Sequence, residues 1–339
     1  MIAVRLGGSR FPESMESSLA HAEVDLELNL PALAMVEVSA DDFSTADWQG
    51  LDLRSITLGT ALEVAFGNNP VMLFTGAVGE LETSLATERT VEFRGFDALY
   101  RLQFGTRIQT YEGKTDSEMV QEIALRNGLD AAAEATQVIW PYVLQAGESD
   151  FDFLRARAER LHYEFFVQGR TLHFRASREG QAADLTLNWK EEIITLNVVL
   201  RALKQGSTVQ RTGWNPRQKQ SIVATVDNGP YTVRMGGQQT GYELSAVYAS
   251  SPVSAPDPEI GDPETATTLA AAKWEAGLDG FIEARATVQG DPRLVPGINV
   301  RVAGVGPRLS GLYYLTAARH AYSPETGYRT HCTLRRTGA

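Results

Sequence analysis

Residues 59–96 read GTALEVAFGNNPVMLFTGAVGELETSLATERTVEFRGF, and residues 297–335 repeat their outline as GINVRVAGVGPRLSGLYYLTAARHAYSPETGYRTHCTLR. Each copy begins with glycine and an alternating apolar and polar strand, passes a Gly/Pro turn, and continues through two more alternating strands. After the turn, each copy resumes at an apolar, hydroxyl, glycine step, at 74–76 and at 309–311. Chance similarity is the alternative, because glycine and alternation are common in β sequences, and we favour a duplication.

The segments that precede the two copies are also similar to each other, but more weakly. VDLELNLPALAMVEVSADDF begins at Val24, and LNVVLRALKQGSTVQRTGWNP begins at Leu196. Strands in which apolar and polar residues alternate present one buried and one solvent-exposed face, as a small barrel or curled sheet requires. We therefore predict a mainly β fold with two similar β-barrels. Residues 1–108 would form the first barrel, and residues 185–226 with 280–339 would form the second.

Residues 109–184, between the two predicted barrels, change to a helical pattern. In KTDSEMVQEIALRNGL, Thr115 and Glu118 fit a capping box, and Asn127 with Gly128 supplies a stop. The apolar residues between these signals share one face at helical spacing, so this stretch predicts a helix of about three turns.

A second helix and a hairpin follow in ESDFDFLRARAERLHYEFFVQGRTLHFRAS, residues 148–177. Ser149 and Asp152 form a variant of the capping box, and apolar residues then recur at helical spacing. The remainder is typical of an aromatic hairpin that turns at Gln168 and Gly169. We therefore predict a peripheral α+β domain made of helices and this hairpin.

Residues 227–279 predict a loop and helix insertion in the second barrel. The segment YASSPVSAPDPEIGDPE is dense in proline and serine, which is typical of an exposed loop. Asp262 and Pro263 then supply an N-cap followed by proline at the first helical position. The helix itself is ETATTLAAAKWEAGLDGF.

The composition excludes several classes of function. With 31 Lys and Arg against 42 Asp and Glu, the net charge of −11 repels the phosphate backbone, so nucleic-acid binding is disfavoured. No apolar run approaches the roughly 20 residues of a membrane span, and the N-terminus has no signal-peptide core. We expect a protein that is made and folded in the cytoplasm, without stable membrane insertion. Cys332 is the only cysteine, and we interpret it as a small buried apolar group.

The sequence offers no motif for catalysis, a cofactor or a metal. Its five histidines, at positions 21, 162, 173, 320 and 331, lack the spacing of metal ligands, and no second cysteine is present. GVGPRLSG, residues 304–311, joins two strands and lacks the third glycine and the helix of a dinucleotide site. No nucleophile elbow or P-loop appears. We therefore predict that the protein is not an enzyme and has no catalytic, cofactor-binding or metal-binding residues.

Two segments carry a family resemblance. GESDFDFLRARAERLHYEFFVQGRTLHFR, residues 147–175, resembles the signature of the late control protein D family, which includes phage baseplate hubs and the hub portion of VgrG-type spikes. Residues 288–336 resemble the closing barrel of that family, with its G-x-x-x-L-x-P-G entry. The strand containing VQRTGWNP is also similar. Leu161 and His162 depart from the pattern, because many relatives have a glycine that closes the helix there.

The resemblance implies a structural baseplate hub. Members of the family form homotrimers in which each subunit contributes two similar barrels, so that three chains make a pseudo-sixfold ring. Such a ring acts as a symmetry adaptor that joins a sixfold inner tube protein to a threefold spike and contacts other baseplate proteins. Some polar faces would line a channel, and neighbouring subunits would cover apolar barrel edges. The protein would then be a component of a phage tail or a phage-tail-like particle.

The resemblance also gives the mid-chain segment a structural role, as a bracket outside the ring. We interpret its apolar side chains as core or inter-domain packing residues, and two barrel residues as interface candidates. The first group is Phe151, Leu154, Leu161, Phe165, Phe166 and Phe174, and the second is Val300 and Leu315.

In fused VgrG-type spikes, further domains and a long β-needle follow the hub. This sequence stops at Ala339, directly after the second predicted barrel, so we expect the spike to be a separate polypeptide. That favours a contractile phage tail, a phage-tail-like bacteriocin or an extracellular contractile injection particle over a type VI apparatus. It does not choose among the first three.

Two other functions stay open on the sequence. A tail-associated peptidoglycan hydrolase would need a pair of acid/base carboxylates in a cleft. A β-sandwich carbohydrate-binding module would need an aromatic platform, for which Trp140, Trp214 and Tyr248 are candidates. We favour turn packing for the two tryptophans, because each lies next to or near a proline.

Overall fold

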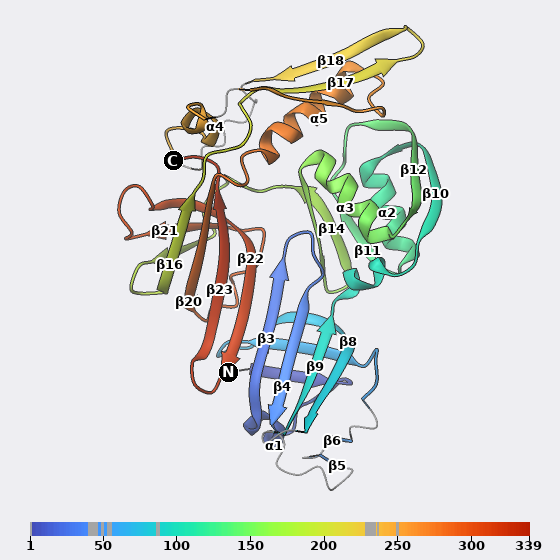
Figure 1. Ribbon diagram of the computed structural model, residues 1–339. Helices are drawn as coiled ribbons and strands as arrows, with labels where there is room; N and C mark the ends of the chain where they lie inside the picture. The colour runs from blue at the N-terminus through green and yellow to red at the C-terminus, as the bar shows by residue number, and fades with distance from the viewer. Residues whose placement is uncertain are drawn as a thin grey trace.

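The computed structural model describes residues 2–39, 47–48, 51–52, 56–85, 89–227, 235, 237–248 and 251–339. These residues are mainly β, and one large sheet holds the strands of both repeats (Figure 1). Its hydrogen-bonded path runs β16-β20-β23-β22-β3-β4-β9-β8-β7-β1-β2. Off this path, β21 pairs with β22, and β15 pairs with β21.

The first half of the sheet comes from the N-terminal hundred residues. Its strands are β1 (Ile2–Leu6), β2 (Ser9–Arg10), β3 (Leu19–Glu27), β4 (Leu33–Ser39), β7 (Ala61–Phe66), β8 (Val71–Leu85) and β9 (Arg89–Phe96). The short helix α1 (Glu13–Ser17) and the small pair β5 (Asp47–Trp48) and β6 (Leu51–Asp52) accompany them, and the 3₁₀ helix η2 (Ala98–Gln103) follows. A core of its own fills this half, with Val24, Val36 and Phe93 among its fully buried residues.

The second half consists of β15 (Leu185–Asn188), β16 (Ile193–Leu200), β20 (Ile282–Gln289), β21 (Asn299–Ala303), β22 (Gly311–Ser323) and β23 (Gly327–Arg336). Its spatial order β16-β20-β23-β22-β21 matches β3-β4-β9-β8-β7 of the first half, strand for strand. The phase of alternation matches as well. Ala34, Val36 and Val38 of β4 are buried, as are Ala284, Ala286 and Val288 of β20. The two halves therefore share the order of five strands, as a duplication predicts, and differ beyond them, because β1 pairs antiparallel with β7 whereas β15 pairs parallel with β21.

The predicted closure into two barrels is wrong, because the described strands form no closed barrel. Each half is an open sheet, and the edge strand β3 pairs antiparallel with β22 of the other half, from Ala22 opposite Tyr322 to Glu27 opposite Ala317. In the first half, the edge of β3 already pairs with the neighbouring half, so it has no free backbone groups with which to close on its own last strand.

The insertion in the second half begins earlier than predicted. The chain leaves the large sheet after Leu200 and returns at Ile282, so β20, and not the strand at Val209, is the counterpart of β4. Between these points, β17 (Val209–Asn215), β18 (Gln220–Val226) and β19 (Val253–Pro256) form a separate three-stranded sheet. Helices α4 (Gly241–Ser245) and α5 (Pro263–Ala276) belong to the same insertion. Asp262 caps α5 and Pro263 opens it, as predicted.

The peripheral α+β unit lies beside the junction of the two halves (Figure 1). It contains the ribbon of β10 (Arg107–Thr115) and β12 (Ile139–Glu148), the helices α2 (Asp116–Arg126) and α3 (Asp150–Leu161), and a sheet of β11 (Asp130–Ala133), β14 (Thr171–Ala176) and β13 (Tyr163–Gln168). The predicted capping box at Thr115 and Glu118 is present. The hairpin turn lies one residue later than predicted, because Gln168 already pairs with Thr171 across Gly169 and Arg170.

One continuous core joins the peripheral unit, the insertion and the second half. Val300 and Leu315, on neighbouring strands, are each 0% exposed within it. Both side chains are thus packed inside a single chain, and neither presents surface to a second subunit.

Replacing Leu315 with alanine removes fully buried methyl groups and leaves a cavity. We expect Leu315→Ala to lower the free energy of unfolding by about 2–5 kcal/mol, measured by urea denaturation. The matched control is Leu309→Ala, whose side chain is more than a third exposed and whose loss costs little. Equal effects of the two substitutions would contradict this account of the core.

Candidate functional site

In the part of the chain that the structure describes, no three His, Cys, Asp or Glu residues gather as metal ligands. The buried polar side chains instead form networks that fix the peripheral unit to the rest of the molecule. None of the described helices is long and apolar enough to cross a membrane. The candidate functional site is therefore a set of junctions between structural units.

The ESDFDFL segment opens α3, and its side chains from Ser149 to Leu154 have packing, capping or ion-pair roles. The hydroxyl of Ser149 accepts a hydrogen bond from the backbone N–H of Asp152 at 3.0 Å and donates to its carboxylate at 2.7 Å. Phe151 packs edge-on against Phe165, with ring centroids 5.7 Å apart. Phe153 stacks on Tyr111 at 5.3 Å. The segment is thus a helix start locked into an aromatic core.

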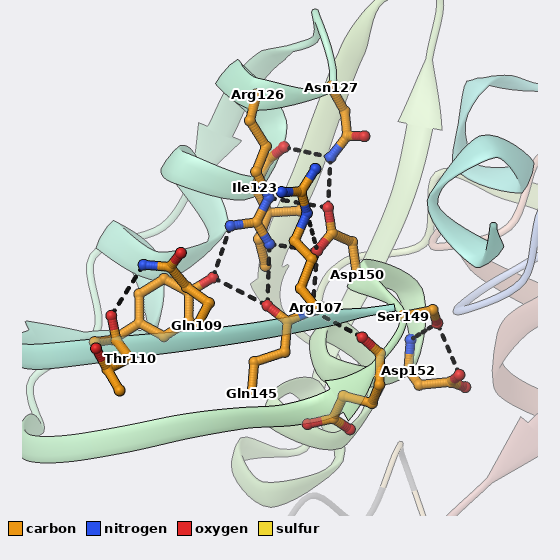
Figure 2. A network of polar contacts seen from close by, with 12 residues as sticks. Arg107, Gln109, Thr110, Ile123, Arg126, Asn127, Gln145, Ser149, Asp150 and Asp152 are labelled. Atoms are coloured by element: carbon orange, nitrogen blue, oxygen red, sulfur yellow. Dashed lines mark hydrogen bonds and ion pairs between the residues drawn. The ribbon is translucent and has the colours of Figure 1, made fainter. Parts of the chain in front are cut away.

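Asp150 is the centre of the first network (Figure 2). Its carboxylate accepts hydrogen bonds from Arg126 Nε at 2.9 Å, Asn127 Nδ2 at 2.8 Å and Gln145 Nε2 at 3.0 Å, and Arg126 also bonds it through a second nitrogen. The same guanidinium donates to the hydroxyl of Tyr111 at 2.9 Å. The network ties the C-terminus of α2 to the N-terminus of α3, where the helix dipole also favours a carboxylate.

The surroundings of Asp150 keep it ionised. Burial alone would raise the pKa of this carboxyl, but the hydrogen bonds from Arg126, Gln145 and Asn127 outweigh it, so the pKa is lowered.

A second network surrounds Trp140 on β12. Its indole N–H donates to Asp116 at 2.7 Å, and the guanidinium groups of Arg157 and Arg160 lie over its ring at 4.5 and 4.9 Å. Arg157 also pairs with Asp116, and both arginines reach Glu259 of the insertion, at 3.1 and 3.2 Å. Through these two arginines, Trp140 joins the peripheral unit to the insertion. Because Trp140 is only 1% exposed, its ring cannot form a carbohydrate platform.

A third network lies at the end of α3. His162 has a left-handed backbone, with φ of 55°, so this position adopts the conformation that glycine favours. Its ring bonds Asp279 at 3.0 Å and approaches Glu275 at 3.6 Å. Arg335 of β23 bridges Asp279 at 2.8 Å and Glu179 at 3.0 Å. Here the peripheral helix, the end of the insertion and the second half meet.

The environment of His162 favours its charged form. Burial alone would lower the pKa of the imidazole, but the hydrogen bonds to Asp279 and Glu275 raise it to about 10. The pKa of Asp279 is lowered in turn, because Arg335 and His162 outweigh the effect of its burial.

The β13–β14 hairpin contacts both halves of the large sheet. The backbone N–H of Phe165 donates to Asn29, which follows β3 of the first half, at 2.8 Å. On the second half, Tyr314 donates to Glu164 at 2.8 Å, and Arg175 donates to the carbonyl of Gly297 at 3.1 Å. The hairpin therefore contacts both halves where they meet.

The junction of the halves also has a charged face. Arg319 of β22 pairs with Asp25 at 2.7 Å and with Glu23 at 3.3 Å, both on β3. The polar face of the sheet around this pair is hollowed, with a volume of about 700 Å³. Polar side chains from both halves line the hollow, among them Asp25, Asn197, Arg285, Thr287, Arg319 and His331.

The structure places the segment residues as packing residues: Phe151, Leu154, Leu161, Phe165 and Phe174 are buried, and Phe166 is half-buried and stacks on His173. Sequence analysis missed Asp150, Arg335 and Arg319, because an ion pair between distant segments leaves no local pattern. Trp214 and Tyr248 are exposed, at 54% and 83%, on different segments of the insertion.

We expect Asp150→Asn to lower the free energy of unfolding by about 2–4 kcal/mol, because it removes the charge that Arg126 requires in a partly buried site. Urea denaturation measures the loss, and hydrogen exchange at the C-terminus of α2 shows where it occurs. The control is Asp130→Asn on β11, an exposed carboxylate. A change for Asp150→Asn no larger than for the control would contradict the role of this network.

Because the pKa of folded His162 is above its unfolded value of 6.5, its stabilisation is complete below pH 6.5 and is lost as pH rises through about 10. We expect the stability of the wild-type protein to fall over this window by more than that of His162→Asn, since asparagine tolerates the left-handed backbone without a charge. Thermal unfolding between pH 6 and 10 measures the difference. Parallel pH profiles for the two proteins would refute it.

Solved structures with this fold are tail proteins and a secretion-system component. A tail protein from Neisseria meningitidis has a TM-score of 0.74 at 13% identity, over 99% of this chain and 96% of that chain. A 43 kDa tail protein of prophage MuSo2 from Shewanella oneidensis has the same score and identity, over 99% of this chain and 98% of that chain. An Escherichia coli component of the type VI secretion system, itself described as similar to phage T4 tail proteins gp27 and gp5, scores 0.65 at 14%, over 99% and 77%. At these identities the likeness shows the fold.

No curated protein matches the chain in sequence. One family model, described as the Alg8 N-terminal domain, matches residues 1–324. The chain therefore belongs to the family of the Alg8 N-terminal domain.

Proposed function

We propose that this chain is a structural hub protein of a contractile tail or tail-like injection particle. In this proposal three copies form a ring with pseudo-sixfold symmetry, which joins a sixfold inner tube to a threefold spike. The fold shared with phage tail proteins and with a type VI component supports a structural role in a tail. The late control protein D family is the finer relationship that the sequence resemblance predicts.

One observation carries the proposal: a single chain holds the same five-strand sheet twice, joined edge to edge through β22 and β3. A ring of three identical chains has threefold symmetry. It can present six similar contacts only if each chain carries the contact surface twice. The matched strand order and burial phase of the two halves meet this condition without a closed barrel.

The polar face of the joined sheet is the surface that we assign to the channel. It is hollowed at the junction, and side chains of both halves share it. The opposite face is packed against the cores and the peripheral unit. We propose that the peripheral unit, roughly residues 109–184, and the insertion lie outside the ring, where other baseplate proteins would bind.

This arrangement also determines which partner each part of the chain would contact. The two halves, in residues 1–108 and in the later segments that include 280–339, would contact the tube protein on one side of the ring and the spike on the other. Assembly would take place in the bacterial cytoplasm before the particle is complete. The buried networks at the candidate site fit a structural role.

Native mass spectrometry and negative-stain microscopy of the purified full-length protein test this function. We expect a trimeric mass, and ring-shaped particles that show six similar lobes. A protein that stays monomeric and globular at the highest concentration at which it remains dissolved would contradict the proposed hub.

A further inference from the structure

Several strand edges of the large sheet have no ladder partner among the described strands, and two of them are counterparts of the edges that pair across the halves. One is the outer edge of β16, which pairs only with β20. The other is the C-terminal part of β8 from Gly79 onward, which pairs with β9 but extends beyond the reach of β7. Exposed edges invite pairing with another chain, and natural proteins usually protect them with charges or proline.

The β16 edge lacks this protection. Its sequence IITLNVVL contains no charged residue and no proline, and Ile194, Val199 and Leu200 are each more than a third exposed. On the β8 edge, Leu81 is 40% exposed between Glu80 and Glu82. An uncharged, exposed edge of eight residues is a surface that a partner strand is expected to cover.

The joined halves provide an internal template for that partner. Within one chain, β22 of the second half pairs with β3 of the first half. Because β8 is the counterpart of β22, and β16 is the counterpart of β3, the equivalent contact between two chains pairs β8 of one with β16 of the next.

The register follows from the ladders. The β22–β23 ladder has a register shift between Leu315 and Ala317, and the β8–β9 ladder has one between Val78 and Glu80. Counted from these two shifts, Leu81 of β8 corresponds to Ala318 of β22. The cross-strand partners on β20 and β4 align β16 with β3, and in this alignment Leu200 of β16 corresponds to Leu26 of β3. In the template, Ala318 lies directly opposite Leu26.

We propose that a second copy of this chain occupies these edges, with β8 antiparallel to β16 of the next copy and Leu81 directly opposite Leu200. The neighbouring pair is then Glu80 opposite Arg201, whose backbone N–H continues the β16 ladder by donating to Phe281. This inference rests on the proposed ring and specifies its contact.

Exposure and charge fit this register. Leu81 and Leu200, 40% and 43% exposed in the single chain, bury each other on the core side of the seam, where Ala318 and Leu26 meet in the template. Glu80 and Arg201 lie on the polar face and have opposite charge. Within the single chain each is held only by an exposed ion pair, to Arg94 and to Glu283, both at 3.1 Å, so either side chain is free to exchange partners.

The overall charge of the halves favours the same head-to-tail order. Residues 1–108 contain 16 Asp and Glu against 7 Lys and Arg, whereas residues 185–200 and 280–339 together contain 5 against 9. An acidic first half therefore meets a basic second half at every contact around the ring, and contacts between like halves are opposed by repulsion. The pair of Arg319 with Asp25 is the internal example of this complementarity.

Disulfide trapping tests the register. Residues directly opposite in an antiparallel pair have Cβ atoms about 4.5–5.5 Å apart, close enough for a disulfide after a small shift. The full chain carrying Leu81→Cys and Leu200→Cys is expected to oxidise to a covalent trimer. Either single variant is expected to remain unlinked. The native Cys332 does not interfere, because burial leaves it 2% exposed and raises its pKa to about 12.

The matched control combines Leu81→Cys with Val199→Cys, which moves the second thiol to the polar face of the strand. If both double variants cross-link to the same extent, the proposed register is wrong. The register is also wrong if neither cross-links although the wild-type mass is trimeric. Neither result would contradict the proposed ring. A monomeric wild-type mass would instead overturn the proposed hub itself.

Charge reversal gives a second, independent readout. Glu80→Arg alone and Arg201→Glu alone are expected to weaken trimer association by roughly three- to tenfold each, and the two together are expected to restore it. Failure of the double variant to recover would show that these side chains do not face each other.

Discussion

The backbone pairing of β22 with β3 is the contact on which the rest of the architecture depends. It joins two sheets of the same strand order edge to edge and occupies the edge that a closed barrel would need. The pairing is held by its ladder and by Arg319 with Asp25 and Glu23 on the polar face. The hairpin β13–β14 braces it from the other side, through Asn29 and Tyr314. A chain built in this way presents one surface twice, in one fixed orientation.

Much of the fold could be predicted from local patterns. Capping residues at Thr115, Ser149 and Asp262 marked three helix starts, because a cap depends on side chains only three positions apart. The repeated outline predicted the shared order of the last three strands in each half. Alternation identifies the buried face of a strand but not the strand that its edge meets, so closure into barrels was predicted where the edges pair across the halves. The partner of β16 was misplaced for a related reason, since a long insertion separates it from β20.

The junction residues were largely beyond sequence analysis. Asp150 meets Arg126 from a different helix, and Arg335 meets Glu179 from 156 residues further along the chain, beyond the whole insertion. Such contacts are set by tertiary packing and leave no periodic signal. His162 was singled out because it stands where relatives have a glycine, and the structure gives the reason that the position is unusual. It keeps the left-handed backbone and adds a cation that Asp279 and Glu275 hold.

In the proposed assembly, each chain supplies two equivalent sectors of a ring through edge-to-edge strand pairing. Cryo-electron microscopy of the assembled protein, refined with threefold symmetry only, tests this most directly. The account predicts a continuous strand wall in which first and second halves alternate around six similar sectors. A map in which the halves occupy different radii, or in which strand edges of adjacent chains do not meet, would contradict it.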